Sequence, residues 1–286
     1  MNNTTHNQIL PPRTSNSVFT QQQQTTQLNN NNKSDEIPFE LIPLPSKGLL
    51  YPESSPLHGV ESVGIRAMTA REEDILMSPA LLKSGGAITE LIKSCLIDKS
   101  IDPLEMISGD RNSLLFSIRI TGYGPEYQAS VECSECEQKS DRTFDLSNVK
   151  INFLDLTPIV PFENKFEFIL PASQKTVIFR FLTGKSEEQA NKTSIARKKA
   201  GLLNDNVITN SLFDSIISIG GIEDKQKIAH EIRSMLARDS LALRQHIAKH
   251  QPDIITKQES TCTHCDHTEE VNIPLGISFL WPNAKR

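Results

Sequence analysis

Short stretches of alternating and of helical hydrophobic spacing follow one another along this chain. Apolar side chains alternate with others over residues 59–68, which predicts a strand. Two further alternating stretches between residues 164 and 182 flank Pro171-Ala172-Ser173-Gln174, as in a β-hairpin. Other strand-like stretches cover residues 127–132, 143–149, 254–261 and 271–273. The strands are therefore expected to be short and antiparallel.

Helical spacing dominates several other segments. Over residues 87–97 the apolar side chains fall on one face of a helix. Thr69 and Glu72 have the spacing of a capping box at the start of an earlier helix. Asp110 is the expected N-cap of a helix that ends near Gly122, although a strand is the alternative there. Further helices are expected over residues 184–202, 224–237 and 240–250, a helical turn over 102–107, and an apolar segment of undetermined type over 212–219. Together these elements predict an α+β fold of mixed helices and short antiparallel strands.

The first 36 residues differ in composition from the rest. Fourteen of residues 1–32 are Asn or Gln, including the runs Gln21–Gln24 and Asn29–Asn32. Such a tract cannot bury enough apolar surface to offset chain entropy, so residues 1–36 are predicted to be disordered. No basic start is followed by an apolar run, so no signal peptide is expected, and no membrane span is predicted.

Ordered sequence is expected from residue 37, where three prolines in nine residues favour an extended arm up to Pro45. Ser46-Lys47-Gly48 then predicts a turn. This apolar arm is the first candidate for docking onto a partner, and packing along its own domain is the alternative. The remaining chain divides into residues 37–160, with the arm, a helical region and a first cysteine pair, and residues 161–286, with the hairpin, a helical region and a second pair.

Four of the five cysteines stand in two Cys-x-x-Cys steps, Cys133/Cys136 and Cys262/Cys265. Four thiolates in two such pairs are the ligand set of a tetrahedral structural Zn²⁺. Because over a hundred residues separate the pairs, a shared ion would build a zinc ribbon from two distant knuckles. Redox disulfides and free thiols are the alternatives, but a thioredoxin-type context is missing. Cys95, on the apolar face of a predicted helix, is interpreted as a core thiol.

The chemistry of such a site is structural. Four cysteines leave no open coordination position, so the ion would activate no water. His264 and His267 lie beside the second pair and are the alternative ligands. Gly184-Lys185-Ser186 resembles the end of a phosphate loop, but Phe179 stands where its first glycine is required. We therefore predict no enzymatic activity.

Charge bears on the choice of partner. The net charge is −5, and no block of five or more lysines and arginines occurs, which disfavours nucleic acid as the main partner. A nucleic-acid-binding zinc-ribbon protein is nevertheless the alternative function. Acidic residues that would repel phosphate flank both knuckles: Glu132, Glu135, Glu137, Asp266, Glu269 and Glu270. Two polar runs, 108–112 and 235–240, contain Asp110, Arg111, Arg238 and Asp239, which are expected either to form ion pairs that fix domain geometry or to serve as caps and surface charge.

Several separated motifs occur in a fixed order along the chain. They are Leu-Pro-Ser-Lys-Gly-Leu-Leu-Tyr-Pro (44–52), Met-Thr-Ala-Arg-Glu-Glu-Asp-Ile-Leu (68–76), Gly-Asp-Arg-Asn-Ser-Leu-Leu (109–115), Ile-Thr-Gly-Tyr-Gly-Pro-Glu-Tyr (120–127), Met-Leu-Ala-Arg-Asp-Ser-Leu-Ala-Leu-Arg (235–244) and Phe-Leu-Trp-Pro (279–282). Through these motifs, residues 38–283 resemble the baseplate hub proteins of contractile-tailed, T-even-like bacteriophages.

The resemblance implies a hub subunit or a hub assembly protein at the base of the phage tail. It implies other tail and baseplate proteins as partners, an oligomeric assembly, and no catalytic activity. Such a protein is expected in the host cytoplasm during assembly and in the tail baseplate of the virion. The residues do not distinguish a subunit that stays in the particle from an assembly chaperone that leaves it.

Overall fold

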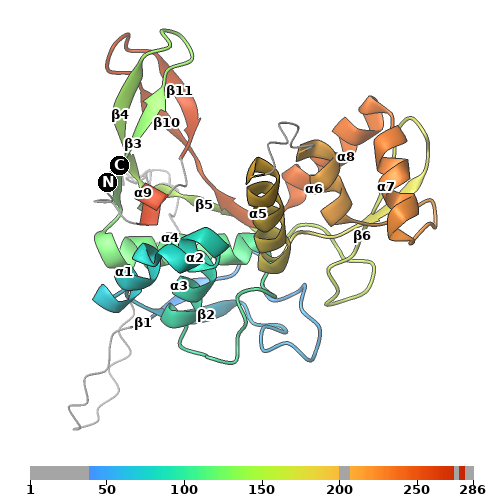
Figure 1. Cartoon of the computed structure of the whole chain (residues 1–286), viewed down its shortest axis with the longest axis horizontal. Helices are drawn as coiled ribbons and strands as arrows, with labels where there is room; N and C mark the ends of the chain where they lie inside the picture. The colour runs from blue at the N-terminus through green and yellow to red at the C-terminus, as the bar shows by residue number, and fades with distance from the viewer. Residues whose placement is uncertain (1–38, 200–206, 274–276, 281–286) are drawn as a thin grey trace, which may run out of the picture.

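The computed structural model describes residues 39–199, 207–273 and 277–280. The predicted disorder of residues 1–36 lies outside the described residues. In the described residues, the elements are helices and short antiparallel strands, which confirms the α+β class. Two strand pairs stand together above a group of helices, and a second helical lobe lies beside that group (Figure 1). Within the described residues, no helix has the length and apolar character of a membrane span.

The elements up to residue 152 begin with a strand pair and continue through four helices to a second strand pair. The first pair is β1 (Phe39–Pro43) with β2 (Ser62–Arg66), and the helices are α1 (Ala70–Met77), α2 (Pro79–Ser84), α3 (Ala87–Cys95) and α4 (Ser108–Tyr123). The chain goes on through β3 (Glu126–Glu132), β4 (Lys139–Asp145), a 3₁₀ turn (Leu146–Asn148) and β5 (Lys150–Asn152).

The later elements begin with a hairpin that gains a third strand. The strands β6 (Phe166–Ile169), β7 (Thr176–Phe179) and β8 (Ile216–Ile219) form one sheet in that order. Around it lie α5 (Gly184–Lys199), α6 (Val207–Ser215), α7 (Lys225–Ser234) and α8 (Ala237–His250). The chain closes with β9 (Asp253–Ile255), β10 (Lys257–Thr261), β11 (Thr268–Asn272) and α9 (Ile277–Leu280).

Most of the predicted elements are present. The capping box is confirmed, because the Glu72 Oε2 atom accepts the Thr69 backbone N–H at 2.9 Å. The hairpin over 164–182 and the helices that follow it are also confirmed, except that residues 200–202 of the first predicted helix lie outside the described residues. Residues 102–107 form a turn and not a helical segment, and the apolar segment 212–219 is the end of α6 followed by β8. The strand that follows each cysteine pair starts earlier than expected, at Lys139 in β4 and at Thr268 in β11. The hydrophobic pattern did not reveal these first residues, because polar side chains such as that of Arg142 occupy inward positions there.

A similar succession of elements occurs twice, in a first half (residues 39–152) and a second half (residues 166–272), although β8 and α7 are additional in the second half. Each half runs from a hairpin through helices to a Cys-x-x-Cys hairpin. The two opening hairpins share their strand register, and in both the first strand leads into a buried Leu followed by Pro. Their equivalent residues are Ile42 and Phe168, Val63 and Val177, and Leu44 and Leu170. These halves describe element order, and the division into domains after residue 160 stays a prediction.

The helices α3 and α6 support this correspondence. Each has nine residues, and the residue that follows each helix pairs with the second strand of its own hairpin. Leu96 bridges to Ile65 after α3, and Ile216 pairs with Phe179 after α6. In the first half this pairing is the single bridge at Leu96, whereas in the second half it continues as the strand β8.

A fully buried aspartate lies at the third position of both α4 and α8. Asp110 accepts a backbone N–H from Ser46 at 2.9 Å, and Asp239 accepts one from Ala172 at 2.7 Å. Both donors follow the Leu-Pro pair of the hairpin in the same half. The N-cap of α4 is Ile107, so the prediction that Asp110 is the N-cap was wrong. Each aspartate instead fixes a distant loop against the start of its helix.

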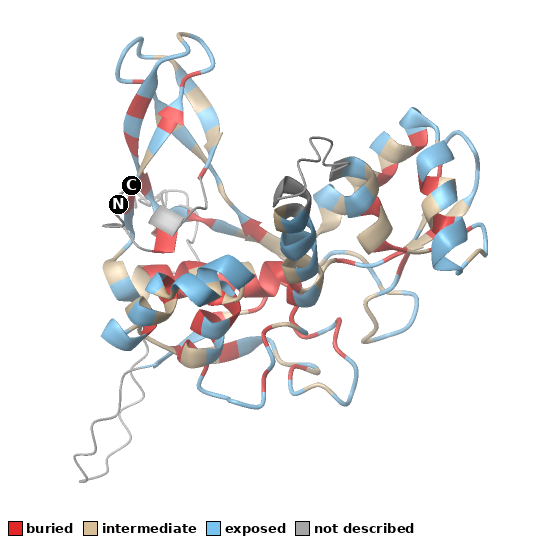
Figure 2. Cartoon of the chain, viewed as in Figure 1, coloured by how far each residue is buried: buried red, intermediate tan, exposed pale blue. Residues whose placement is uncertain are grey.

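Direct contacts join the halves. Strand β5 pairs with β9, and Asn112 of α4 donates a hydrogen bond to Asp253 at 3.0 Å. The Nε atom of Arg111 lies 3.6 Å from the Oε2 atom of Glu187 in α5. This contact confirms an ion pair for the polar run 108–112. Buried positions concentrate along α4 at the centre of the molecule (Figure 2). Helix α4 is therefore the element on which both halves meet.

Asp110 is expected to make stability depend on pH. Burial raises its pKa from an ordinary value of 3.8 to about 6, although hydrogen bonds from Ser46 and Tyr51 lower it. A raised pKa means that the folded protein binds the proton more tightly, so this contribution is fully present below pH 3.8 and is lost as the pH rises through 6. We expect Asp110→Asn to remove about 2 kcal/mol of the pH dependence between pH 4 and 7, measured by urea unfolding.

The control for this experiment is Asp141→Asn, which changes an exposed carboxylate on β4. The control should follow the wild-type pH profile. If the free energy of unfolding of Asp110→Asn varies with pH as it does in the wild type, Asp110 is not the source of the pH dependence.

Candidate metal centre

The four cysteines predicted as ligands come together at the tips of two hairpins. Cys133 and Cys136 lie in the turn between β3 and β4, and Cys262 and Cys265 in the turn between β10 and β11. Their sulfur atoms all lie within 4.8 Å of one another. The two hairpins rise side by side from the helical layer, with their tips together (Figure 1).

The spacing of the sulfur atoms fits a tetrahedral site. The Sγ atoms of Cys133 and Cys265 are 3.7 Å apart, and those of Cys136 and Cys262 are 3.8 Å apart. A Zn–S bond of about 2.3 Å gives a tetrahedron whose edges are about 3.8 Å long. All four cysteines are free of disulfide bonds. The donor set therefore fits Zn²⁺, and ligation by these four residues stays a prediction.

Both knuckles have the same backbone turn. The N–H of Cys133 donates to Gln138 O at 3.0 Å, and the N–H of Cys262 donates to His267 O at 2.8 Å. The residue after the second cysteine is left-handed in each case, with φ of 57° at Glu137 and 56° at Asp266. This conformation reverses the chain and leaves the two sulfur atoms of each step on the same side. The repeated sequence pattern thus has a repeated geometry.

The histidines beside the second pair do not join the cluster. The group of possible ligand atoms contains cysteine sulfur alone, so neither His264 nor His267 belongs to it. The His264 backbone N–H instead donates to the Cys262 sulfur at 3.4 Å. A backbone donor of this kind stabilises a thiolate without replacing it as a ligand.

A polar network below the sulfur atoms ties the two hairpins together. Glu269 of β11 accepts hydrogen bonds from the Ser134 hydroxyl at 2.6 Å and from Arg142 of β4 at 3.0 Å. The hydrogen bond from Ser134 is the main cause that lowers the pKa of Glu269. Arg142 is buried and also reaches Ser260 O at 3.4 Å. Sequence reasoning missed this network, although Ser140, Arg142 and Phe144 alternate on the inward face of β4.

Cys95 lies apart from this centre, in the hydrophobic core. It is fully buried on α3, and burial raises the pKa of its thiol to about 11. A protonated, buried thiol neither binds a metal ion nor attacks an electrophile readily. The interpretation as a core residue is confirmed.

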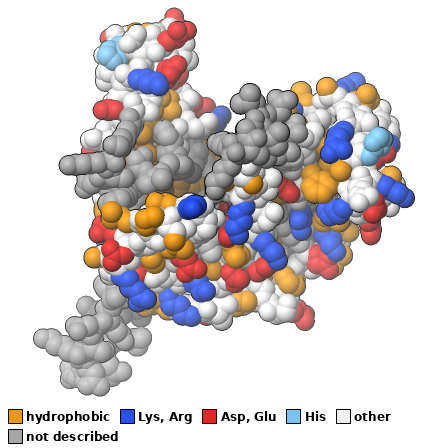
Figure 3. Space-filling view, in the orientation of Figure 1, with side chains coloured by type: hydrophobic (Ala, Val, Ile, Leu, Met, Phe, Trp, Pro, Cys, Tyr) orange, Lys and Arg blue, Asp and Glu red, His pale blue; other side chains and the backbone are white. Residues whose placement is uncertain are grey.

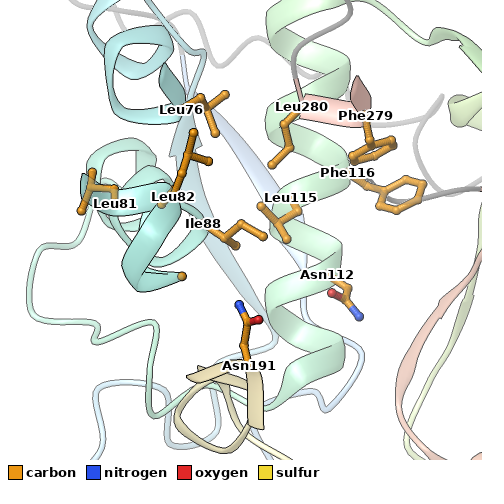
Figure 4. Close-up of a pocket in the computed structure, with 12 residues that line it drawn as sticks. Leu76, Leu81, Leu82, Ile88, Asn112, Leu115, Phe116, Asn191, Phe279 and Leu280 are labelled. Atoms are coloured by element: carbon orange, nitrogen blue, oxygen red, sulfur yellow. The ribbon is translucent and has the colours of Figure 1, made fainter. Parts of the chain in front are cut away.

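An apolar cavity lies beside α4. It has a volume of about 360 Å³ and opens between α1–α3, α4, α5 and α9 (Figure 4). Leu76, Leu82, Ile88, Leu115 and Leu280 point into it, and Asn112 and Asn191 lie at one end. The described residues that line it include no ionisable side chain, so this cavity offers no group for acid–base catalysis.

A comparison with protein families bears on the function. The family model described as T4 bacteriophage base plate protein matches residues 43–281, most of the chain. The chain belongs to this family. Comparisons with curated proteins and with solved structures found no match. The resemblance is therefore confirmed at the level of a T4-like base plate protein, a structural component of the phage tail. Membership implies other phage tail proteins as the partners of this base plate protein.

Proposed function

We propose that this base plate protein is a structural or assembly component of the baseplate hub, and that one Zn²⁺ ion cross-links its two halves. The observation that carries the proposal is the convergence of four cysteine sulfur atoms, two from each half of the chain. A shared ion would hold the halves in one orientation, and a rigid surface is what a part with several neighbours needs. The hub assignment itself depends on the family resemblance and on the motifs in residues 44–282.

The proposed ligands are Cys133, Cys136, Cys262 and Cys265. Four thiolates complete a tetrahedral shell, so the ion would stabilise structure and polarise no substrate. Binding of Zn²⁺ to such a site converts on the order of 10 kcal/mol into folding free energy. The hydrogen bonds of Glu269 to Ser134 and Arg142 support the same orientation of the hairpins.

Protein–protein contact is the favoured mode of action. A nucleic-acid-binding zinc ribbon would present its knuckles to phosphate, but carboxylates surround both tips. Phosphate binding draws its affinity from lysine and arginine, so this surface charge opposes it. The protein would act in the host cytoplasm during assembly and within an oligomeric baseplate, with other tail proteins as its neighbours.

The test is a phage that carries Cys133→Ser together with Cys262→Ser. Plaque formation and complete base plates are expected to be lost, because the halves no longer share a metal ion. A tagged wild-type protein should recover tail and base plate proteins from infected cells, without DNA. Glu135→Ser, which changes an exposed residue of the first knuckle, is the matched control and should assemble normally. Normal base plates in the cysteine variant, or salt-sensitive recovery of DNA, would contradict the proposal.

A further inference from the structure

We propose that the outer face of the β1–β2 pair and the basic pocket beside it bind an extended segment of another base plate protein, one that carries apolar side chains next to carboxylates. This inference rests on the proposed function and names the chemistry of one partner.

The outer face of β1 is apolar and open. Phe39 and Leu41 are 60% and 57% exposed, Glu40 between them is also exposed, and Ile42 after them is buried. Leu41 lies opposite Gly64 of β2, and a Cβ atom at Gly64 would be 3.2 Å from Ile97 and 3.5 Å from Phe39. Ile97 is itself 48% exposed. Phe39, Leu41 and Ile97 therefore form one continuous surface, here called the apolar face.

A basic pocket adjoins the apolar face. Arg66 lies opposite Phe39 in the strand register and lines a cavity of about 410 Å³ with Arg71, Lys93 and Lys99. Glu90 is the acidic residue of the lining. Arg66 is paired with Glu72 at 2.6 Å, but the other three cations form no ion pair among the described residues. Lys and Arg side chains gather below the hydrophobic ones over the α1–α3 region in Figure 3.

The cations of the pocket repel one another. Lys99 donates hydrogen bonds to Lys93 O at 3.0 Å and Ser94 O at 2.9 Å, which holds its ammonium group at the end of α3. Burial and then the positive charge of Arg66 lower the pKa of Lys99. A carboxylate bound in the pocket would relieve this repulsion, so the site is complementary to an acidic side chain.

The second half of the chain provides an internal comparison. From the shared strand register, Lys165 and Glu167 correspond to Phe39 and Leu41. Both residues are exposed, and Lys165 pairs with Glu163 at 2.7 Å. The same position of the fold thus accepts polar residues, so folding does not require the apolar face. An apolar surface that folding does not require indicates a binding site.

Part of the basic pocket is also specific to the first half. The helices α3 and α6 have the same length and end just before the bridging positions Leu96 and Ile216. Lys93 then corresponds to Phe213, whereas Arg66 corresponds to another arginine, Arg180. The combination of an apolar face with a basic pocket therefore occurs in the first half and not at the equivalent place in the second.

The form of the surface favours a protein segment over nucleic acid. A phosphate backbone would contact the cations but would leave the apolar face in water. A segment with alternating side chains covers both, because β1 is an edge strand in the described sheet and can accept another extended chain. The carboxylates of such a segment would enter the pocket while its apolar side chains cover Phe39 and Leu41.

The test is site-specific photo-crosslinking in infected cells. The full chain carries p-benzoylphenylalanine at position 41, and the crosslinked peptide is identified by mass spectrometry. We expect a peptide from another base plate protein of the phage, with Asp or Glu adjacent to apolar residues. Adding Arg71→Glu and Lys93→Glu should lower the yield at least about tenfold, because like charges then face each other. The same label at position 167, the equivalent site in the second half, is the control and should not give this peptide.

A second variant separates binding from folding. Phe39→Lys with Leu41→Glu introduces the residues that the second half carries at these positions, so the unfolding transition and zinc content should stay unchanged. Recovery of the partner should fall at least about tenfold. A crosslink to this chain itself, to its residues 1–38 or to DNA, or a yield that charge reversal leaves unchanged, would overturn the proposal. If this variant still assembles base plates and binds the partner, the binding site inferred here is wrong, but the proposed function stands. If the wild-type protein recovers no tail protein, the proposed function is wrong.

Discussion

Replacing Cys133 and Cys262 by serine is expected to abolish zinc binding and to lower the free energy of unfolding by on the order of 10 kcal/mol. The change removes one thiolate from each knuckle, and the sulfur pairs at 3.7 and 3.8 Å then cannot close a tetrahedron. Metal analysis should give about one zinc per wild-type chain and none in the variant. Urea unfolding with and without a chelator should show the same difference in stability.

Cys95→Ala is the matched control for this experiment. It removes a cysteine that is buried in the core and distant from the cluster, so zinc content should stay at about one per chain. Its cost in stability should be about 1 kcal/mol, the usual effect of a small cavity. Two zinc ions per wild-type chain would mean that each knuckle binds its own ion, and the shared site would be wrong.

Substitution of Gly109 by alanine is expected to be the most damaging single change outside the cysteines. Gly109 lies where the start of α4 crosses the start of β9, and an added Cβ atom would be 1.8 Å from Pro252 O. The obstacle is backbone, so a side-chain rotation cannot relieve the clash. Moving the two segments apart would also strain the hydrogen bond between Asn112 and Asp253. We expect a loss of about 4 kcal/mol in urea unfolding.

Gly86→Ala tests whether any glycine change has this effect. At Gly86 the nearest atoms to an added Cβ are 3.5 and 3.9 Å away, which is ordinary contact. Stability should therefore change by less than about 1 kcal/mol. If Gly109→Ala unfolds at the same urea concentration as the wild type, α4 and β9 do not approach as closely as described.

Much of the candidate metal centre could be predicted from sequence, because its signal is local. The spacing of Cys133 and Cys136, repeated at Cys262 and Cys265, fixes two identical turns whatever surrounds them. What the spacing does not contain is the orientation of one hairpin against the other. That orientation depends on Arg142 and Glu269, and charged residues in a strand are usually interpreted as surface.

The misassigned aspartate shows a different limit. Asp110 has the right residue type and nearly the right position for an N-cap, so local rules favour that role. Its actual partners are Ser46 and Tyr51, about sixty residues earlier in the chain. A hydrogen bond between segments so far apart leaves no local sequence pattern. The role of Asp110 therefore depends on its burial against the distant loop.

The correspondence between the halves was visible in sequence at the knuckles alone. A long connection follows β1, whereas a short one follows β6, so the spacing between equivalent residues shifts along the chain. The equivalent aspartates Asp110 and Asp239 also stand in different local sequences. Strand register and helix length reveal the repeat, because these persist where residue identity does not.

The distance between the two knuckles along the chain has a consequence for synthesis. Cys262 is synthesised more than a hundred residues after Cys136. A nascent chain that ends between these two residues would carry two of the four proposed ligands and could not bind a shared ion. Binding of Zn²⁺ would then follow synthesis of the second knuckle, and a chain truncated before it would stay more open to the proteases of the infected cell.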